Sequence, residues 1–317
     1  MIFKIFTVFV IICSSVFIYS THSRPVIKVK LQNLHQNAKI TDFSMIKEIL
    51  EEKYVIKITN KDDYDLIINS VFGNDPINNN NAIKIFFIGE AYPAKLENYD
   101  LSIGFAPIDE EWSNYIRIPL YYFYNNINKN LEPSFKRGKC KNDHPHFACF
   151  LVGNGSKERY YDGVSARDRL FHRLSLYKPV VSGGGHLNNI GKTVSSEDTL
   201  EFLSKCKFVI AYENQTYPGY TTEKVFNAYF SGSVPIYYAD IKAQEDINKK
   251  AIISAQDFET EEDLVNYIIE VDKNDKKYCE IWEQIIITDH KMDYENMKNK
   301  LRQKLAPILK RKIDEKF

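Results

Sequence analysis

The sequence predicts an α/β protein with two doubly wound domains that face a shared cleft. Apolar stretches of strand length alternate with amphipathic stretches of helical period along most of the chain. The alternation occurs in two series, separated by a polar stretch at 128–145 that is rich in charged and turn-forming residues. Strands that alternate with helices are typical of parallel sheets covered on both faces. Because ligands of such sheets bind beyond the carboxyl ends of the strands, the cleft is the expected binding site.

The first series contains a helix among buried strands. Its predicted elements are a strand at 26–31, a helix at 43–54, strands at 65–73, 82–89 and 99–105, and an apolar stretch at 116–127. The helix prediction depends on Met45, Ile46, Ile49 and Leu50, whose spacing places them on one side.

The second series alternates strand and helix more regularly. Its predicted elements are strands at 147–153, 179–185, 207–214 and 233–239, and helices at 165–177, at 197–206 and from Thr221 or Thr222 to Gly232. A chain of 317 residues is long enough for two domains. The predicted segments are a signal anchor or signal peptide at 1–24, a first domain at 25–139, a second domain at 140–290 and a basic amphipathic tail at 291–317.

Charge is balanced over the whole chain and uneven at its end. Lys and Arg number 42, as do Asp and Glu, which argues against a nucleic-acid partner. The tail 291–317 holds nine Lys and Arg against four Asp and Glu. Leu301, Leu305 and Ile308 share one side of a basic helix that Pro307 would kink. That side can lie on an anionic membrane surface or pack on the second domain.

The N-terminus predicts export. Residues 5–20 (IFTVFVIICSSVFIYS) carry no charge, but they are fewer than the roughly 20 residues that span a bilayer core of about 30 Å. The stretch suits a signal peptide or an anchor for a thin membrane. Cleavage after Ser20 is disfavoured because Ile18 is not small, so an uncleaved type II anchor is favoured. The rest of the chain is then expected on the lumenal side of the Golgi or endoplasmic reticulum, or outside the cell.

Export to an oxidising compartment would allow the cysteines to form disulfides. Cys13 lies in the apolar stretch, and the other four are Cys140, Cys149, Cys206 and Cys279. A chain of this size allows one disulfide and requires none. Cys140, His144, His146 and Cys149 have spacings that suit zinc, but a Cys140–Cys149 bridge or two free thiols is the favoured interpretation.

The stretch Tyr212–Asp240 carries the strongest chemical signal. It joins two buried strands through a turn-prone loop and a short helix that opens with two threonines, a glutamate and a lysine. A helix N-terminus at the carboxyl end of a strand presents N–H groups and a positive dipole end, which suit a diphosphate. The simpler interpretation is that Thr221 or Thr222 only caps the helix.

This stretch closely resembles the α-1,3/α-1,4-fucosyltransferase family, glycosyltransferase family 10, and its bacterial members in particular. The family's hallmark motifs have counterparts in YEN (212–214), YTTEK (220–224) and SVPIYY (233–238), in the family's order and spacing. The resemblance extends over about 65–290 through IKIFFIGEAYP, YDLSIGF, FACFLVGN and ARDRLFHRL. It implies a GT-B-like fold of two Rossmann-like domains, the first on the acceptor side and the second binding the donor.

The resemblance also implies a reaction. Family members move L-fucose from GDP-fucose, with inversion, to a hydroxyl of an acceptor glycan on an oligosaccharide, glycoprotein or glycolipid. They need no metal or other cofactor, and an α-1,3 linkage is expected. Such a transfer needs a carboxylate base for the incoming hydroxyl and charge stabilisation for the departing GDP.

Glu90 is the expected base. It directly follows the strand predicted at 82–89 and matches the family's catalytic glutamate. Without the resemblance, a surface carboxylate in the turn before Pro93 is the preferred interpretation.

The resemblance assigns donor binding to the second domain. Arg167 and Lys224 match the cations that hold the diphosphate, Glu223 matches a ribose contact and Tyr220 a nucleotide contact. The predicted donor-binding set is Arg167, Asn214, Tyr220, Thr222, Glu223 and Lys224. Glu213 either adds a contact or braces the loop.

Other motifs have simpler interpretations. The Asp-x-Asp in 62–65 (DDYD) is the metal signature of another glycosyltransferase fold, but it precedes a strand, which favours a solvated turn. Gly183–Gly185 either lets backbone approach the nucleotide or forms a plain flexible loop. Of the glycosylation sequons at 154–156 and 214–216, the second is expected to stay unmodified because it lies in the donor loop.

Two alternatives stay open. The same fold can use another nucleotide sugar, or the chain can be an inactive lectin-like module that binds glycans. Retention of Glu90, Arg167 and Lys224 together disfavours the lectin.

Overall fold

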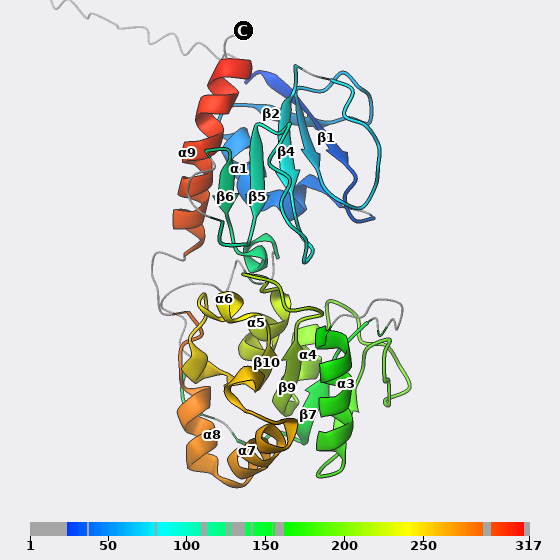
Figure 1. Ribbon diagram of the computed structural model, residues 1–317, viewed down its shortest axis with the longest axis vertical. Helices are drawn as coiled ribbons and strands as arrows, with labels where there is room; N and C mark the ends of the chain where they lie inside the picture. Colours follow the sequence, from blue (N-terminus) through cyan, green and yellow to red (C-terminus); the bar gives the residue numbers. More distant parts are fainter. Residues whose placement is uncertain are drawn as a thin grey trace, which may run out of the picture.

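The computed structural model describes residues 24–36, 38–79, 81–108, 113–124, 127, 137–140, 142–153, 155, 162–287 and 293–313. Two β-sheets lie toward opposite ends of the long axis, each with its own helices (Figure 1). The apolar stretch at 5–20 and both ends of the sequon at 154–156 lie outside the described residues. Among the described helices, none combines the length and apolar character that a membrane span requires.

The first sheet has six strands in the order β2-β1-β3-β4-β5-β6, and every neighbouring pair is parallel. The strands are β1 (Val26–Gln32), β2 (Val55–Ile58), β3 (Leu66–Asn69), β4 (Ile83–Phe87), β5 (Leu101–Gly104) and β6 (Tyr115–Arg117). The helical elements of this part are η1 (Ile40–Phe43), α1 (Ser44–Glu51) and η2 (Leu120–Phe123). The predicted apolar side of α1 is buried, which confirms that helix.

The strand β2 has no counterpart in the sequence prediction. It follows α1 closely and lies at the edge of the sheet, with Val55 and Ile58 each 45% exposed. An edge strand that buries little apolar surface leaves only a weak pattern in the sequence.

The second sheet has five parallel strands in the order β11-β10-β9-β7-β8. The strands are β7 (His146–Phe150), β8 (Val180–Ser182), β9 (Cys206–Tyr212), β10 (Val234–Tyr238) and β11 (Ile253–Ser254). The helices are α3 (Asp162–Ser175), α4 (Thr199–Leu203), α5 (Glu223–Phe230), α6 (Ile241–Gln244), α7 (Glu261–Lys273) and α8 (Asp275–Trp282), with 3-10 turns η3 (Lys249–Ala251) and η4 (Ala255–Asp257).

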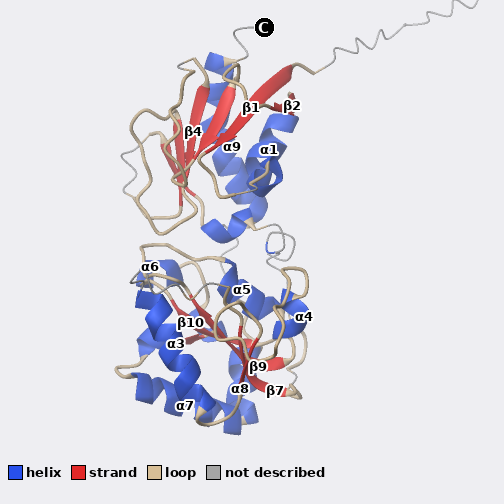
Figure 2. Ribbon diagram, turned by 90° about the vertical axis from the view of Figure 1, so that its right-hand side faces the viewer, coloured by secondary structure: helices blue, strands red, loops and turns tan. Residues whose placement is uncertain are grey.

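Helices cover both faces of the second sheet, as predicted for a doubly wound domain. Leu170 of α3 shares a buried cluster with Phe208 and Ile210 of β9. Val225 of α5 packs in a different cluster, with Val209. Because alternate residues of β9 face alternate sides, α3 and α5 lie on opposite faces (Figure 2).

Each sheet reverses its winding at one point. In the second sheet β8 lies beyond β7 and β10 lies beyond β9, so the chain winds in opposite directions from the β7/β9 pair. The β1/β3 pair plays the same part in the first sheet. Connections diverge at such a point and leave a crevice at the carboxyl ends of the strands.

The helices α7 and α8 were not predicted, although α7 carries clear signals. The Thr260 side chain accepts a hydrogen bond from the Asp263 N–H at the start of α7. Leu264, Ile268 and Val271 form its buried side at helical spacing.

The basic tail forms α9 (Tyr294–Lys312), which packs on the first sheet and corrects both expectations for it. Its buried side is Met297, Leu301, Leu305 and Leu309, and Figure 1 shows it beside α1. The Lys298 side chain forms an ion pair with Glu48 of α1, and the Arg302 side chain pairs with Glu52 at the C-cap of that helix. The apolar side therefore faces the protein interior, away from the second sheet.

The two halves meet through aromatic contacts. Phe105, just after β5, lies 5.2 Å from Tyr220 between ring centroids, and Tyr121 of η2 lies 4.4 Å from Phe226 of α5. Arg117 of β6 forms an ion pair with Asp246, which follows α6. The buried cluster beneath the first sheet is thus continuous with the face of the second sheet that carries α5.

Two disulfides replace the predicted pairing. Cys140 is bonded to Cys279 of α8, and Cys149 of β7 is bonded to Cys206 of β9. The Cys140–Cys149 prediction was wrong because Cys149 lies inside the sheet facing its neighbouring strand, whereas Cys140 lies against α8. With both cysteines bonded elsewhere, the zinc alternative loses its thiolate ligands.

Candidate active site

The carboxyl ends of both sheets line one pocket of about 810 Å³. The first sheet contributes His35, Phe72 and Glu90, and the second sheet with its helices contributes the rest. The second-sheet lining is Leu151, Val152, Gly153, Val164, Arg167, Gly184, Gly185, Thr193, Val194, Ser196, Thr199, Leu203, Val209, Ile210, Ala211, Asn214, Glu223, Lys224 and Asn227. The pocket therefore lies at the two points where the winding reverses.

The first-sheet wall comes from three adjacent strands. His35 follows the end of β1 by three residues, Phe72 follows β3 by three and Glu90 follows β4 by three. Parallel neighbours bring these positions to the same edge of the sheet. The expectation that Glu90 emerges at a carboxyl end and faces the cleft is confirmed.

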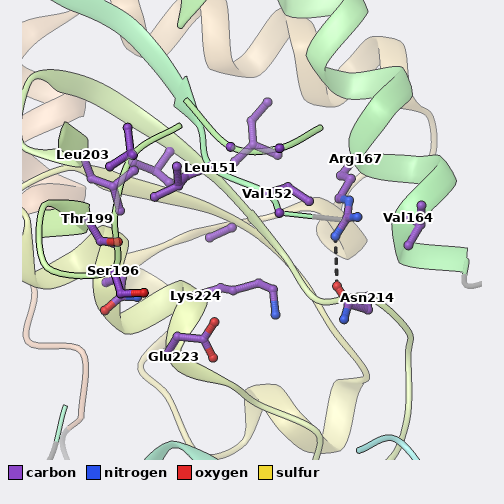
Figure 3. A pocket seen from close by; sticks show the side chains of 18 of the residues that line it. Leu151, Val152, Val164, Arg167, Ser196, Thr199, Leu203, Asn214, Glu223 and Lys224 are labelled. Atoms are coloured by element: carbon purple, nitrogen blue, oxygen red, sulfur yellow. Dashed lines mark hydrogen bonds between the residues drawn. The ribbon is translucent and has the colours of Figure 1, made fainter. Parts of the chain in front are cut away.

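The opposite wall includes the start of α5. Glu223 and Lys224 open the helix, and Asn227 follows one turn later on the same side. Figure 3 shows the Lys224 side chain extending toward Arg167 and Asn214.

A buried carboxylate organises this wall. Glu213 is fully buried and accepts hydrogen bonds from the Thr222 N–H at 2.7 Å and the Thr222 hydroxyl at 2.7 Å. It also accepts from the Lys224 ammonium at 3.1 Å and the Tyr237 hydroxyl at 3.2 Å. Of the two interpretations of Glu213, the brace is what the geometry supports.

The Thr222 side chain is part of this brace. Thr222 is the N-cap residue of α5, but its side chain accepts no bond from the helix backbone. Its hydroxyl donates to Glu213 and accepts from Lys224 at 2.9 Å. The capping interpretation therefore holds for the position of Thr222 but not for its side chain, which bonds to Glu213.

Lys224 keeps its charge in the pocket wall. Burial lowers the pKa of its ammonium, but the carboxylates of Glu213 and Glu223 outweigh burial, so the pKa is raised. About a quarter of the side chain is exposed, 23%, which leaves the cation within reach of a ligand.

Arg167 supplies a second cation from the helix on the other face of the second sheet. It lies on α3, is 1% exposed, and its Nη1 donates to the Asn214 side-chain oxygen at 2.9 Å (Figure 3). Burial lowers the pKa of the guanidinium, and Asp168 and Glu213 oppose that shift. Arginine nonetheless stays charged at any physiological pH.

Two glycines allow the close approaches that shape the pocket. A Cβ at Gly163 would lie 2.0 Å from the Glu213 carbonyl oxygen, so only glycine lets α3 reach the end of β9. A Cβ at Gly184 would lie 2.0 Å from the Val152 carbonyl oxygen. This contact shows that two loops pack closely at Gly184, a role that differs from both interpretations of Gly183–Gly185.

The structure brings together five of the predicted site residues: Glu90, Arg167, Asn214, Glu223 and Lys224. Tyr220 and Thr222 do not line this pocket, since Tyr220 packs on Phe105 and Thr222 bonds to Glu213.

Tyr124 is a neighbour of the site that the sequence did not reveal. Burial raises its pKa well above the usual range, and the adjacent Glu223 carboxylate raises it further. Tyr124 follows η2 and so reaches α5 from the other half of the molecule, which no local pattern announces.

The remaining motifs have structural roles. Asp62 and Asp63 pair with Lys30 and Lys28, in keeping with a solvated turn. In the second sequon the Thr216 hydroxyl donates to Asp162 at 2.6 Å, and Asn214 accepts from Arg167. Within the part of the chain that the structure describes, no three His, Cys, Asp or Glu side chains gather to hold a metal ion.

Comparison with known proteins finds matches to one enzyme family over both halves of the chain. The profile described as "Glycosyltransferase family 10 (fucosyltransferase) C-term" matches residues 143–306, and "Alpha-(1,3)-fucosyltransferase FucT N-terminal domain" matches 29–124. The alpha-(1,3)-fucosyltransferase FucT of Helicobacter pylori is 28% identical over 280 residues, which cover 78% of this chain and 58% of that protein.

Further relatives cover less of the sequence or share only the fold. Mouse 4-galactosyl-N-acetylglucosaminide 3-alpha-L-fucosyltransferase 9 is 30% identical over 132 residues, 41% of this chain and 34% of that protein. The chain thus spans between a third and three fifths of the length of these relatives. A crystal structure of an alpha1,3-fucosyltransferase, also solved with GDP-fucose, has a TM-score of 0.73 at 23% identity, over 92% of each chain. The two family profiles, which together cover most of the described sequence, show that this chain belongs to glycosyltransferase family 10, the fucosyltransferases.

Proposed function

We propose that this chain is an inverting fucosyltransferase that moves L-fucose from GDP-fucose to a hydroxyl of an acceptor glycan, in α-1,3 linkage. The observation that carries the proposal is the shared pocket: Glu90 lines one wall, and the cations Arg167 and Lys224 line the other. The names of the relatives from Helicobacter pylori and mouse support the donor sugar and the linkage.

The second-sheet wall suits the diphosphate of the donor. Arg167 and Lys224 place two positive charges beside the N-terminus of α5, whose dipole adds to the attraction for phosphate oxygens. The Arg167 fork is already oriented by Asn214 and the Lys224 ammonium by Glu213, so little conformational entropy is lost on binding. The carboxylate of Glu223 can accept hydrogen bonds from ribose hydroxyls.

The same two cations stabilise the leaving group. As the bond from fucose C1 to the β-phosphate oxygen breaks, negative charge grows on GDP, and preoriented cations in a partly desolvated site act on it strongly. These two side chains supply the charge that a divalent cation supplies in other nucleotide-sugar enzymes, so we propose that the reaction needs no metal.

The first-sheet wall supplies the base. The Glu90 carboxylate takes the proton from the acceptor hydroxyl, whose oxygen attacks C1 of fucose from the face opposite GDP. One bond forms and one breaks at C1 through an oxocarbenium-like state, and the configuration inverts.

The proposal also covers the cellular compartment in which the chain folds and acts. Two disulfides within the described residues support folding in an oxidising compartment. We propose that residues 1–24 anchor the chain as a type II membrane protein, with the catalytic part in the Golgi or endoplasmic reticulum lumen or outside the cell. Protease protection of microsomes tests on which side of the membrane the catalytic part lies. The mass of the N-terminal peptide tests whether residues 1–24 are retained as an anchor.

The activity is tested in two steps. Thermal shift with GDP, UDP, GMP and guanosine identifies which nucleobase the donor carries, since a ligand at 100 times its Kd adds about 2.7 kcal/mol of stability. Release of GDP from GDP-fucose is then followed with an array of acceptors that includes 4-galactosyl-N-acetylglucosaminide, and NMR of the product gives the linkage. Stabilisation by UDP in place of GDP would contradict GDP-fucose as the donor. Glycan binding without GDP release would favour the lectin alternative.

A further inference from the structure

The first-sheet wall carries an aromatic pair beside Glu90. The rings of His35 and Phe72 meet edge to face, with centroids 5.5 Å apart and planes at 88°. Phe72 is 45% exposed, and both side chains line the pocket. The described lining of this wall, which is His35, Phe72 and Glu90, contains no Lys or Arg, whereas Arg167 and Lys224 lie on the opposite wall.

The backbone that presents Phe72 is held firmly. The Phe72 N–H donates to the Asn33 carbonyl oxygen at 2.9 Å. The Asn33 side-chain amide donates to Asn69 at 2.9 Å and to the Asp75 carbonyl at 3.0 Å, and its oxygen accepts from the Asp75 N–H at 3.2 Å. Gln32 adds two more bonds, to the carbonyl oxygens of Asp75 and Pro76. Bonds from the end of β1 thus fix the loop after β3.

A fixed, half-exposed ring in a pocket differs from a stray apolar residue on a surface. Single exposed apolar side chains are common and need no explanation. Here the ring is braced, paired with a second ring and turned to the pocket that holds the proposed base. Ligand pockets combine aromatic surface with a few oriented polar groups, as this wall does.

The occupant follows from charge and position. The anionic half of the donor is drawn to the opposite wall by its two cations. A wall that has no Lys or Arg in its described lining but carries a carboxylate suits a neutral ligand with an apolar face and a hydroxyl, which describes a pyranose ring. We propose that His35 and Phe72 form the acceptor subsite, in which the C–H face of the acceptor sugar stacks on the Phe72 ring and its hydroxyl points to Glu90. The proposal rests on the transfer reaction proposed above and adds the residues that select the acceptor.

The test separates acceptor from donor. Phe72→Ala, Phe72→Tyr and the control Ile58→Ala are assayed with GDP-fucose and 4-galactosyl-N-acetylglucosaminide. Ile58 lies in the first sheet, has the same exposed fraction as Phe72, 45%, and does not line the pocket. We expect Phe72→Ala to raise the acceptor KM about tenfold, the size of effect that one lost stacking ring gives, and to change the KM for GDP-fucose less than twofold. Phe72→Tyr restores the acceptor KM, and Ile58→Ala leaves both constants as in the wild type.

A second measurement does not depend on turnover. Saturation-transfer NMR of the same disaccharide on wild type should show the strongest transfer to protons of one sugar face, and Phe72→Ala should abolish that pattern. If Phe72→Ala raises the KM for GDP-fucose instead, the ring belongs to the nucleotide and the proposal is overturned. An unchanged acceptor KM and unchanged NMR pattern overturn it as well. Absence of GDP release together with a Phe72-dependent NMR pattern refutes the transfer reaction and keeps the glycan subsite.

Discussion

Replacing Glu213 by glutamine tests whether the buried carboxylate organises the donor wall. The amide has nearly the same shape, and its oxygen can still accept from the Thr222 N–H and the Tyr237 hydroxyl. Its NH2 group can donate to the Thr222 hydroxyl in place of accepting from it. The contact that cannot survive is the one with Lys224, because the amide NH2 and the ammonium are both donors.

The magnitude follows from this single loss. A hydrogen bond to a charged group contributes about 1.5–3 kcal/mol, and breaking a buried ion pair costs about 3–5 kcal/mol. Lys224 is 23% exposed, so water relieves part of the cost. We expect Glu213→Gln to lower the free energy of unfolding by about 2 kcal/mol. For a domain of roughly 150 residues, this corresponds to a decrease in Tm of about 4–8 °C. The KM for GDP-fucose should rise as well, since Lys224 loses its orientation.

Urea unfolding at pH 7 and steady-state kinetics measure both effects. Glu201→Gln is the control, because Glu201 is 75% exposed and its bond to Lys205 joins two exposed residues four positions apart in the chain. We expect it to change the unfolding free energy by less than about 0.5 kcal/mol. If Glu213→Gln is as stable as the control and binds the donor as wild type does, the carboxylate does not hold the wall together.

Three further predictions concern the donor, acid and redox state. Lys224→Met should weaken GDP binding about 10- to 100-fold while guanosine binding stays the same, because only the diphosphate meets the ammonium; calorimetric titration of both ligands checks this. Burial raises the pKa of Asp162, but hydrogen bonds from the Thr216 N–H and hydroxyl, the Tyr238 hydroxyl and the Gly163 N–H together outweigh burial, so the pKa is lowered. Ionised Asp162 therefore stabilises the fold above its unfolded pKa of about 3.9, and this stabilisation is lost as the pH falls through the lowered value. The stability difference between wild type and Asp162→Asn should accordingly shrink on acidification below about pH 4, and a constant difference would contradict the assignment. Cys140→Ser should lower the free energy of unfolding by about 3–5 kcal/mol, since the bond to Cys279 closes a separation of 139 residues; an unchanged Tm under oxidising conditions would show that the bond is dispensable.

Local patterns predicted most of the fold and the parts of the site that lie directly after strands. The α1 side with Met45 and Leu50 and the α5 segment after β9 carry period and boundary signals within a few residues. Glu90 could be predicted because it follows an apolar strand and matches a family motif. Parallel strands then bring it to the edge that holds the pocket.

Features that depend on distant partners were missed or predicted wrongly. The Cys140–Cys279 bond and the packing of α9 on α1 join residues far apart in sequence, and nothing local specifies either pairing. Tyr124 reaches Glu223 only because the two halves pack together. The brace role of Glu213 was one of two open interpretations, and it took the Thr222 contacts to decide between them.

The most direct test of the account is the Glu90→Gln variant. Glutamine keeps the size of the side chain and removes the basic oxygen, while the donor wall with Arg167 and Lys224 stays intact. Single-turnover transfer from GDP-fucose to the disaccharide and calorimetric binding of GDP are measured on the same preparation. General base catalysis contributes about 10²–10⁴-fold, so we predict that transfer falls by at least 100-fold while GDP binds as it does to wild type. Transfer within a few-fold of wild type would contradict the assignment of Glu90 as the base across the pocket from the donor cations.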